Sequence, residues 1–283
     1  MKKYTKVIKR FLALATPAIA TSILATLPSQ AATFASSESK FNINNFSSSP
    51  LDVRILTDTF TNTISTGGQV TADANAEAKF NIDANNSASN LSFSQAQGQG
   101  DGYTGSAKSF AGIIGYDFTV DKEFSFDFSG FFKLKTSIDD ALTESANAYG
   151  LFSYQLYDSD SNELLDSFNI YGNLSTLGNN DAFAFEPSSN ITFDLSKTDK
   201  SFGGTEEYAS AIFKGKYSRT FDKSTRLLLK EYKSNQVSVY TVPEPSTILG
   251  SLFSCTMFGA VSIRKRKRAS SAALLVNKDL RSV

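Results

Sequence analysis

The sequence predicts an all-β fold: a single β-sandwich or jelly-roll-like domain, flanked by an N-terminal signal helix and a C-terminal transmembrane helix. Three observations support this prediction. Apolar and polar residues alternate with a period of two over most of the central chain, which is the pattern of strands with one buried face. The same region has no long stretch with the period of an amphipathic helix. The two long apolar stretches lie near the ends of the chain.

Residues 1–31 have the features of a secretory signal peptide. A basic head precedes an apolar run from Phe11 to Leu27, and small residues lead up to Ala31. These are the three parts of such a leader, whereas an amphipathic N-terminal helix, the alternative, predicts a polar face that this run lacks. We expect signal peptidase to cleave between Ala31 and Ala32. The basic residues are Lys2, Lys3, Lys6, Lys9 and Arg10.

Residues 242–268 form a second segment of distinct composition. An apolar stretch, Ile248–Ile263, follows a Pro-Glu-Pro tripeptide and ends at five consecutive basic residues. As a helix it would be about 24 Å long, and the long stems of the basic residues extend its reach across the membrane. Basic residues at this end predict that it stays in the cytoplasm. The residues concerned are Pro243, Glu244, Pro245, Arg264, Lys265, Arg266, Lys267 and Arg268.

This order of tripeptide, apolar span and basic cluster resembles the PEP-CTERM sorting signal of bacteria that use an exosortase. The resemblance implies that an exosortase-type membrane protease recognises Pro243, Glu244 and Pro245. It further implies transient anchoring in the membrane, followed by release to the cell surface or exterior. The polar tail 269–283 departs from the family, which usually ends just after its basic cluster. An ordinary C-terminal anchor is the alternative interpretation.

Composition excludes several classes of chemistry. The chain has no His and a single Cys. These counts exclude Ser-His-Asp and Cys-His nucleophiles, His-ligated metals and an intrachain disulfide. Cys255 lies inside the apolar C-terminal stretch, so the central domain has no sulfur chemistry. We expect no cofactor.

The central domain, residues 32–241, is acidic although the whole chain is balanced. The chain carries 28 Lys and Arg against 28 Asp and Glu, and the terminal segments hold twelve of these bases and two of the acids. The remaining 16 bases and 26 acids give the domain a net charge of −10. Such a charge argues against nucleic acid as a partner. Phe202–Thr241 is relatively basic within it, which suits either head-to-tail association, contact with anionic polysaccharide or a solvated face.

The alternation is clearest over Glu123–Lys135, where Phe131 alone breaks the pattern. The segment Gln69–Ala84 alternates as strictly, but its Ala content also suits a helix. We predict a strand, whose small Ala side chains let another sheet or loop approach closely. The remaining predicted strands are Val53–Ile64, Asn90–Gln95, Tyr116–Val120, Tyr149–Tyr157, Leu164–Tyr171, Ile191–Leu195, Ala209–Tyr217, Arg226–Tyr232 and Gln236–Thr241.

Two further segments are rich in small or polar residues. Gly98–Gly115 is rich in Gly, Ser and Gln, which predicts a loop. Ser36–Pro50 is polar, and the sequence leaves open whether it is disordered or forms a first strand.

The turn Asp158–Glu163 begins like a calcium-binding loop. Asp158, Asp160 and Asn162 place oxygen side chains at alternate positions. An EF-hand loop needs Gly at its sixth position and an acid at its twelfth, where this chain has Glu163 and Asn169. We therefore predict a hairpin turn in which these side chains bind their own backbone. A calcium site completed by distant residues is the alternative.

Paired carboxylates are the candidates for catalysis without His. They are Asp139 with Asp140, Glu206 with Glu207, and Asp127. Adjacent residues of a strand point to opposite faces, and all five occupy polar surroundings, so we expect no enzyme.

The sequence predicts an exported surface or extracellular-matrix protein of structural or adhesive type. The alternative is a lectin-like, carbohydrate-binding sandwich that acts on exopolysaccharide. The 24 Phe and 11 Tyr offer rings for stacking on sugars, but most of the Phe fall on predicted inner faces, where core packing accounts for them.

Overall fold

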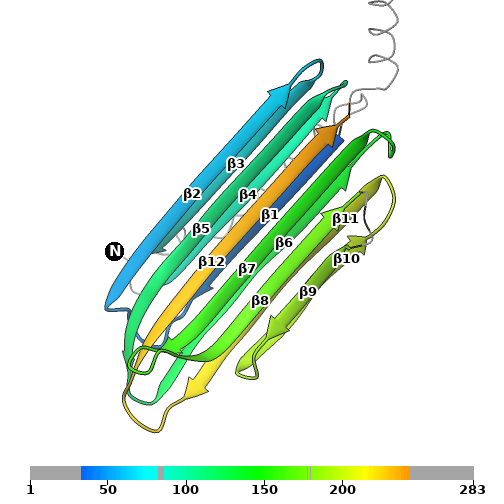
Figure 1. Cartoon of the computed structure of the whole chain (residues 1–283). Helices are drawn as coiled ribbons and strands as arrows, with labels where there is room; N and C mark the ends of the chain where they lie inside the picture. The colour runs from blue at the N-terminus through cyan, green and yellow to red at the C-terminus, as the bar shows by residue number, and fades with distance from the viewer. Residues whose placement is uncertain (1–32, 82–85, 177, 179, 243–283) are drawn as a thin grey trace, which may run out of the picture.

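A computed structural model describes residues 33–242 except 82–85, 177 and 179. These residues form two six-stranded sheets that lie face to face, with antiparallel neighbours throughout (Figure 1). The all-β prediction is confirmed, and the arrangement is consistent with a β-sandwich. The predicted signal and membrane-spanning helices lie outside the described residues. Among the described residues, no helix has the length and apolarity to cross a membrane.

Each sheet mixes strands that are distant in sequence. Sheet A has the order β10 (Ile191–Ser201), β11 (Glu206–Thr220), β6 (Glu123–Ser137), β1 (Thr33–Asn44), β4 (Ser87–Gln99), β3 (Gln69–Asn81). Sheet B has the order β2 (Asp52–Ser65), β5 (Tyr103–Val120), β12 (Thr225–Thr241), β7 (Glu144–Asp158), β8 (Glu163–Ser175), β9 (Ala182–Pro187).

Strand β6 has the two faces that its alternation predicts. Phe124, Phe126 and Phe132 are fully buried between the sheets, and Phe131 points to the outer face. The predicted hairpin of β7 and β8 is also confirmed, with Tyr154 opposite Phe168.

The loop predicted for Gly98–Gly115 is wrong, since most of it belongs to the strand β5. Gly105, Ala107 and Ser109 alternate inward with polar residues outward. The period of two is therefore present, but small side chains conceal it. The register of β5 with its partner β2 shifts between Arg54 and Ile55, which pair with Gly115 and Ile113, so β5 has a β-bulge at this point. Before the bulge the odd-numbered residues of β5 face inward, and after it the even-numbered residues do.

Other element boundaries differ in instructive ways. The segment that begins at Ser36 forms part of β1, in the middle of sheet A. The two segments predicted at 226–232 and 236–241 are one strand, β12. The sequence suggested two because Lys233 and Asn235, which are polar, occupy buried positions that normally hold apolar residues. The short strand β9 was not predicted.

The ambiguous segment at 69–84 is a strand, as predicted, at one edge of sheet A. Its Ala side chains face the opposite sheet, and the two sheets approach closely here. A Cβ at Gly105 of β5 would lie 2.6 Å from Cγ2 of Val70 on β3 and 3.7 Å from Cβ of Ala96 on β4. Small residues therefore set the narrow spacing of this half of the molecule.

The other half of the core is filled by aromatic rings. The rings of Phe41 and Phe152 stack with centroids 4.1 Å apart, and those of Phe126 and Tyr217 with centroids 5.1 Å apart. Offset and edge-on pairs of this kind stabilise a core beyond the area that they bury. Most Phe side chains thus serve packing, as the sequence predicted.

Candidate binding groove

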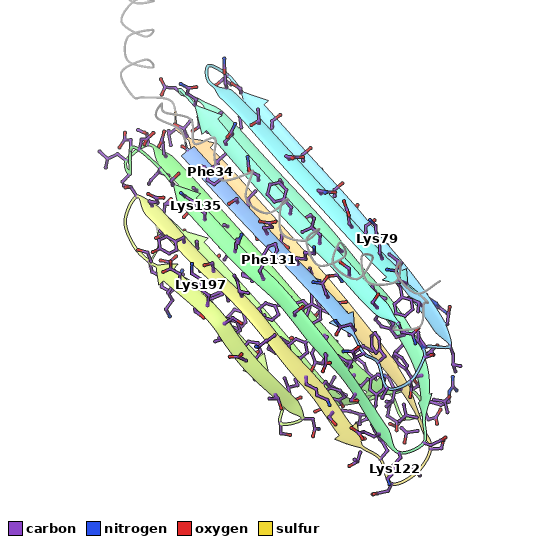
Figure 2. All side chains as sticks on the ribbon, turned by 180° about the vertical axis from the view of Figure 1, so that it is seen from behind. Phe34, Lys79, Lys122, Phe131, Lys135 and Lys197 are labelled. Carbon is purple, nitrogen blue, oxygen red and sulfur yellow. The ribbon has the colours of Figure 1, made fainter. Side chains whose placement is uncertain are left out.

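A groove crosses the outer face of sheet A, where Phe131 lies near the middle (Figure 2). Its volume is about 490 Å³. Strands β6, β1, β4 and β3 supply its lining, and the antiparallel register aligns their outward residues in rows. Asn90 differs from the other lining residues, because it is 1% exposed and lies at an inward-facing position of β4. The lining residues are Glu38, Lys40, Asp73, Asn75, Glu77, Lys79, Ser89, Asn90, Leu91, Phe93 and Phe131.

The floor of the groove is apolar. Phe93 lies opposite Glu38 in the register, and Leu91 lies opposite Lys40, which in turn pairs with Phe131. The three apolar side chains are each partly exposed. Lys133 holds its Nζ 4.8 Å from the centroid of the Phe131 ring, a cation–π contact that orients the ring.

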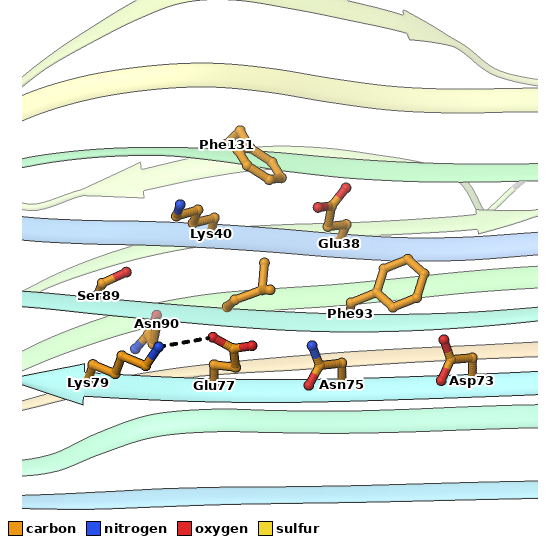
Figure 3. Close-up of a pocket in the computed structure, with 11 residues that line it drawn as sticks. Glu38, Lys40, Asp73, Asn75, Glu77, Lys79, Ser89, Asn90, Phe93 and Phe131 are labelled. Atoms are coloured by element: carbon orange, nitrogen blue, oxygen red, sulfur yellow. Dashed lines mark ion pairs between the residues drawn. The ribbon is translucent and has the colours of Figure 1, made fainter. Parts of the chain in front are cut away.

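Charged and amide groups surround this floor. Glu77 and Lys79 form an ion pair of 3.6 Å, drawn as a dashed line in Figure 3. Burial raises the pKa of the Glu38 carboxyl, while the charges of Lys133 and Lys40 oppose that shift. An apolar floor surrounded by hydrogen-bonding groups suits a ligand with an apolar face and hydroxyl groups at its edge.

A second hollow of about 470 Å³ lies where β1, β6, β11 and β10 adjoin. Asn45 Nδ2 donates to Asp127 Oδ2 at 2.8 Å, and Lys214 pairs with Asp194 at 3.4 Å. Two pairs of its polar side chains therefore satisfy one another.

The two pairs of candidate acids lie at the same end of sheet A, where Glu206 is paired with Ser137 and the Ile138 N–H donates to the Thr205 oxygen at 2.8 Å, but their side chains have different partners. Glu206 is exposed and pairs with Lys135 at 2.6 Å, whereas Glu207 is buried and accepts hydrogen bonds from Thr136 and Gly203. Burial raises the pKa of Glu207. The prediction that these neighbours face opposite ways is confirmed.

Asp139 and Asp140 lie in the turn between β6 and β7, whereas Asp127 of the second hollow lies near the opposite end of β6. Their backbone N–H groups donate to Glu144 Oε2 at 2.7 and 3.2 Å. This pair of acids is therefore held in a turn by hydrogen bonds to Glu144, a residue of the same segment.

The predicted hairpin turn at Asp158 is confirmed. Asp158 Oδ1 accepts from the backbone N–H groups of Asp160 and Ser161 at 2.9 and 3.0 Å. These bonds, with that from Ser161 first, hold the pKa of Asp158 below its usual value. Asn162 has φ 56°, the left-handed conformation that Asn tolerates in turns. Within the described ranges, no three His, Cys, Asp or Glu residues cluster as metal ligands do.

The remaining sequence candidates lie outside the described residues. These are Ala31 and Ala32 of the cleavage site and the sorting residues from Pro243 to Arg268. The sequence signal that best indicated the groove was Phe131, the single residue that breaks the alternation of β6.

Comparison with known proteins identifies no family. No protein-family model matches the chain, and no curated protein matches it. The chain is aligned with a solved structure titled "Crystal structure of lysenin pore" over 67% of its own length and 99% of that chain, at 8% identity. The TM-score of 0.08 is too low to support any argument about fold or function.

Proposed function

We propose that the chain is an exported surface or extracellular-matrix protein of structural type, which assembles with copies of itself through the edge strand β2. The observation that carries this proposal is the difference between β2 and the other sheet edges. Natural edge strands avoid association by being short, by carrying Lys or Pro, or by bulging. Three of the four edges have such features along their length. In β2 the charged residues, Asp52, Arg54 and Asp58, and the register shift lie in the first half, and the second half, 59–65, has no charge, Pro or register shift.

The three protected edges each use a different device. Strand β3 carries Asp73, Glu77 and Lys79 on its outer face. Strand β9 has six residues and ends at Pro187. Strand β10 has a register irregularity between Leu195 and Lys197.

Strand β2 is long and presents apolar side chains. It has 14 residues without Lys or Pro, and in the described part of the chain it pairs with β5 on one side only. Leu56, Phe60 and Ile64 are 49%, 56% and 59% exposed. Alternate positions of one strand place these three side chains on the same face. An antiparallel pair of β2 strands from two copies would pair the free backbone groups and place the two apolar rows side by side on the joined sheet.

Sedimentation velocity of the full chain in detergent micelles, which cover the terminal apolar segments, tests this assembly. We expect concentration-dependent association that Phe60→Lys weakens about tenfold or more, because the substitution places a charge on the pairing edge. Ile212→Lys is the matched control, since Ile212 is 48% exposed on an inner strand, β11. A parent that stays monomeric, or equal effects of both substitutions, would contradict the proposal.

A second candidate function is carbohydrate binding in the groove of sheet A. It is favoured by Phe93 and Phe131, two partly exposed rings among charged and amide groups. A glycan array probed with the full chain should then show sugar-specific binding that Phe131→Ala removes. Phe110→Ala, on the outer face of sheet B, is the control. Binding that both variants retain would count against the groove.

Delivery to the cell surface is the third part of the proposal, and it rests on the sequence of the two ends. Export, signal peptidase cleavage at Ala31 and exosortase processing near Pro243 predict a product without either apolar segment. Intact mass of the protein recovered from the cell exterior measures this directly. Retention of residues 248–283 in that product would argue against sorting.

A further inference from the structure

Strand β12 turns three polar side chains into the core, where an alternating strand normally places apolar ones. Glu231, Lys233 and Asn235 are 1%, 0% and 0% exposed. Ionised groups without water are costly unless they are paired and hydrogen-bonded. The hydrogen bonds and ion pairs of each of the three therefore show whether the cost of its burial is offset.

Lys233 lies among aromatic rings with one acidic partner. Its Nζ donates to Glu231 Oε1 at 2.8 Å and lies 5.3 Å and 5.0 Å from the ring centroids of Phe41 and Phe152. An ammonium group has three N–H donors, so this single hydrogen bond leaves it incompletely satisfied. Glu231 Oε2 has no hydrogen-bond partner.

Asn90 faces this pair from the opposite sheet. Its Cα pairs with that of Phe41, the ring that Lys233 contacts. Along β4, Ala96 lies near Val239, and Ser92 Oγ lies 2.7 Å from Oγ of Ser109, the residue paired with Asn235. Two residues further along both strands, the inward-facing Asn90 reaches the level of Lys233.

The Asn90 side chain is 1% exposed, and neither Nδ2 nor Oδ1 has a hydrogen-bond partner. A buried amide without partners costs free energy that folding must offset. Asn235 provides the contrast, because its Oδ1 accepts from Ser39 at 2.8 Å and its Nδ2 donates to Ser37. One buried Asn is therefore satisfied, and the one facing Lys233 is not.

We propose that Lys233 and Asn90 form an intramolecular isopeptide bond that joins the two sheets, with Glu231 carrying the proton. The neutral amine of Lys233 attacks Cγ of Asn90, and a new C–N bond forms. Glu231 accepts the proton that leaves Nζ and passes it to the amide nitrogen of Asn90. The bond from Cγ to that nitrogen then breaks, and ammonia departs. The products are one secondary amide and one ammonia, with no change of oxidation state.

The surroundings of Lys233 favour this reaction. Burial lowers the pKa of its ammonium group to about 8, against the pull of the Glu231 carboxylate. A larger share of the amine is therefore neutral and nucleophilic near neutral pH than for an exposed Lys. The product amide also replaces a buried charge and a buried, unpaired primary amide by a single neutral group.

Such a bond suits an exported domain without disulfides. The single Cys of the chain is Cys255, outside the two sheets. A covalent link between β4 in sheet A and β12 in sheet B closes a long loop, which restricts the unfolded chain as a disulfide does.

Mass spectrometry of the full chain tests the proposal. We expect an intact mass about 17 Da below the sequence mass, or below that of its processed form, because one ammonia is lost. Trypsin should release a branched product in which residues 80–108 are joined to a peptide that begins at residue 231. A parent with the full mass and both peptides linear overturns the proposal without reference to any variant.

Substitutions distinguish this bond from other losses of ammonia. Asn90→Ala, Lys233→Arg and Glu231→Gln should each restore the full mass, and Asn90→Asp should lose about 18 Da, one water, instead. Asn235→Ser is the matched control and should keep the loss of ammonia. A loss that persists in Asn90→Ala, or that maps to other peptides, overturns the assignment.

Discussion

The buried carboxylate of Asp166 joins three elements through hydrogen bonds: its own strand β8, strand β11 and the turn between β9 and β10. Its carboxylate is 3% exposed and accepts hydrogen bonds from Tyr217 at 2.8 Å, Ser188 at 2.8 Å and Arg219 at 2.9 Å, with two more from Asn190. Burial acts to raise the pKa of Asp166, but these hydrogen bonds, with that from Arg219 first, lower it overall. The charge is thereby stabilised by groups on β11 and on the turn between β9 and β10.

Asp166→Asn should lower the free energy of unfolding by about 2–3 kcal/mol at neutral pH, because it removes one partner of a buried, hydrogen-bonded ion pair. The pKa of the folded state lies below that of the unfolded state. The stabilisation is therefore present above about pH 4 and is lost as the pH falls through the folded value. Urea unfolding from about pH 3 to 7 measures it. Asp194→Asn, which removes an exposed pair, is the control; a constant difference between parent and Asp166→Asn across this range would contradict the pKa assignment.

At the scale of the element, β3 shows how packing resolves an ambiguous segment. Its Ala-rich sequence suits a helix by intrinsic propensity. A helix would scatter the alternating apolar residues around its circumference, whereas a strand places all of them against sheet B. The close approach of β5, where Gly105 meets Val70, is possible only because these residues are small.

Hydrogen exchange measured by NMR tests the state of β3 directly. As an edge strand paired with β4 alone in the described part of the chain, it should show slow exchange at alternate amides, because every second N–H points away from the sheet. A helix would instead protect consecutive amides after its first turn. Protection of β12, which has partners on both sides, should be continuous and serves as the internal control.

For the whole molecule, small residues also determine how closely large rings pack between the sheets. Gly150 on β7 faces Phe132 on β6 of the opposite sheet, and a Cβ there would lie 2.4 Å from Cζ of that ring. Gly172 on β8 is similarly close to Leu134. The aromatic half of the core therefore depends on glycine at these facing positions.

Gly150→Ala should lower the free energy of unfolding by about 1–3 kcal/mol, because the added methyl group must displace a packed ring. Gly115→Ala is the matched control, since its nearest contact is 3.5 Å away. Chemical denaturation of both variants measures the difference. Equal stabilities would show that the sheets separate freely at this point.

Much of the fold could be predicted from the sequence, and the strand predictions failed where inward-facing residues are small or polar rather than large and apolar. Period-two alternation identified β6, β7 and β8 because large apolar residues mark their inner faces. It was missed in β5 before the predicted segment Tyr116–Val120, because the inner residues there are mainly Gly, Ala and Ser, which hydropathy barely separates from a polar loop. The buried Lys233 and Asn235 similarly divided β12 into two predicted segments.

The sequence by itself determined the strand-rich class, the acidic charge of the central domain and the expectation of export, because each depends on local pattern or composition. The tertiary structure alone decided which strands are neighbours and which edges are open. It also decided that Phe93 and Phe131 share one groove and that Asn90 and the Lys233 ammonium group both lie beside Phe41. The physical reason is that alternation specifies the face on which a side chain lies, whereas its partners depend on long-range strand pairing and on the packing of one sheet against the other.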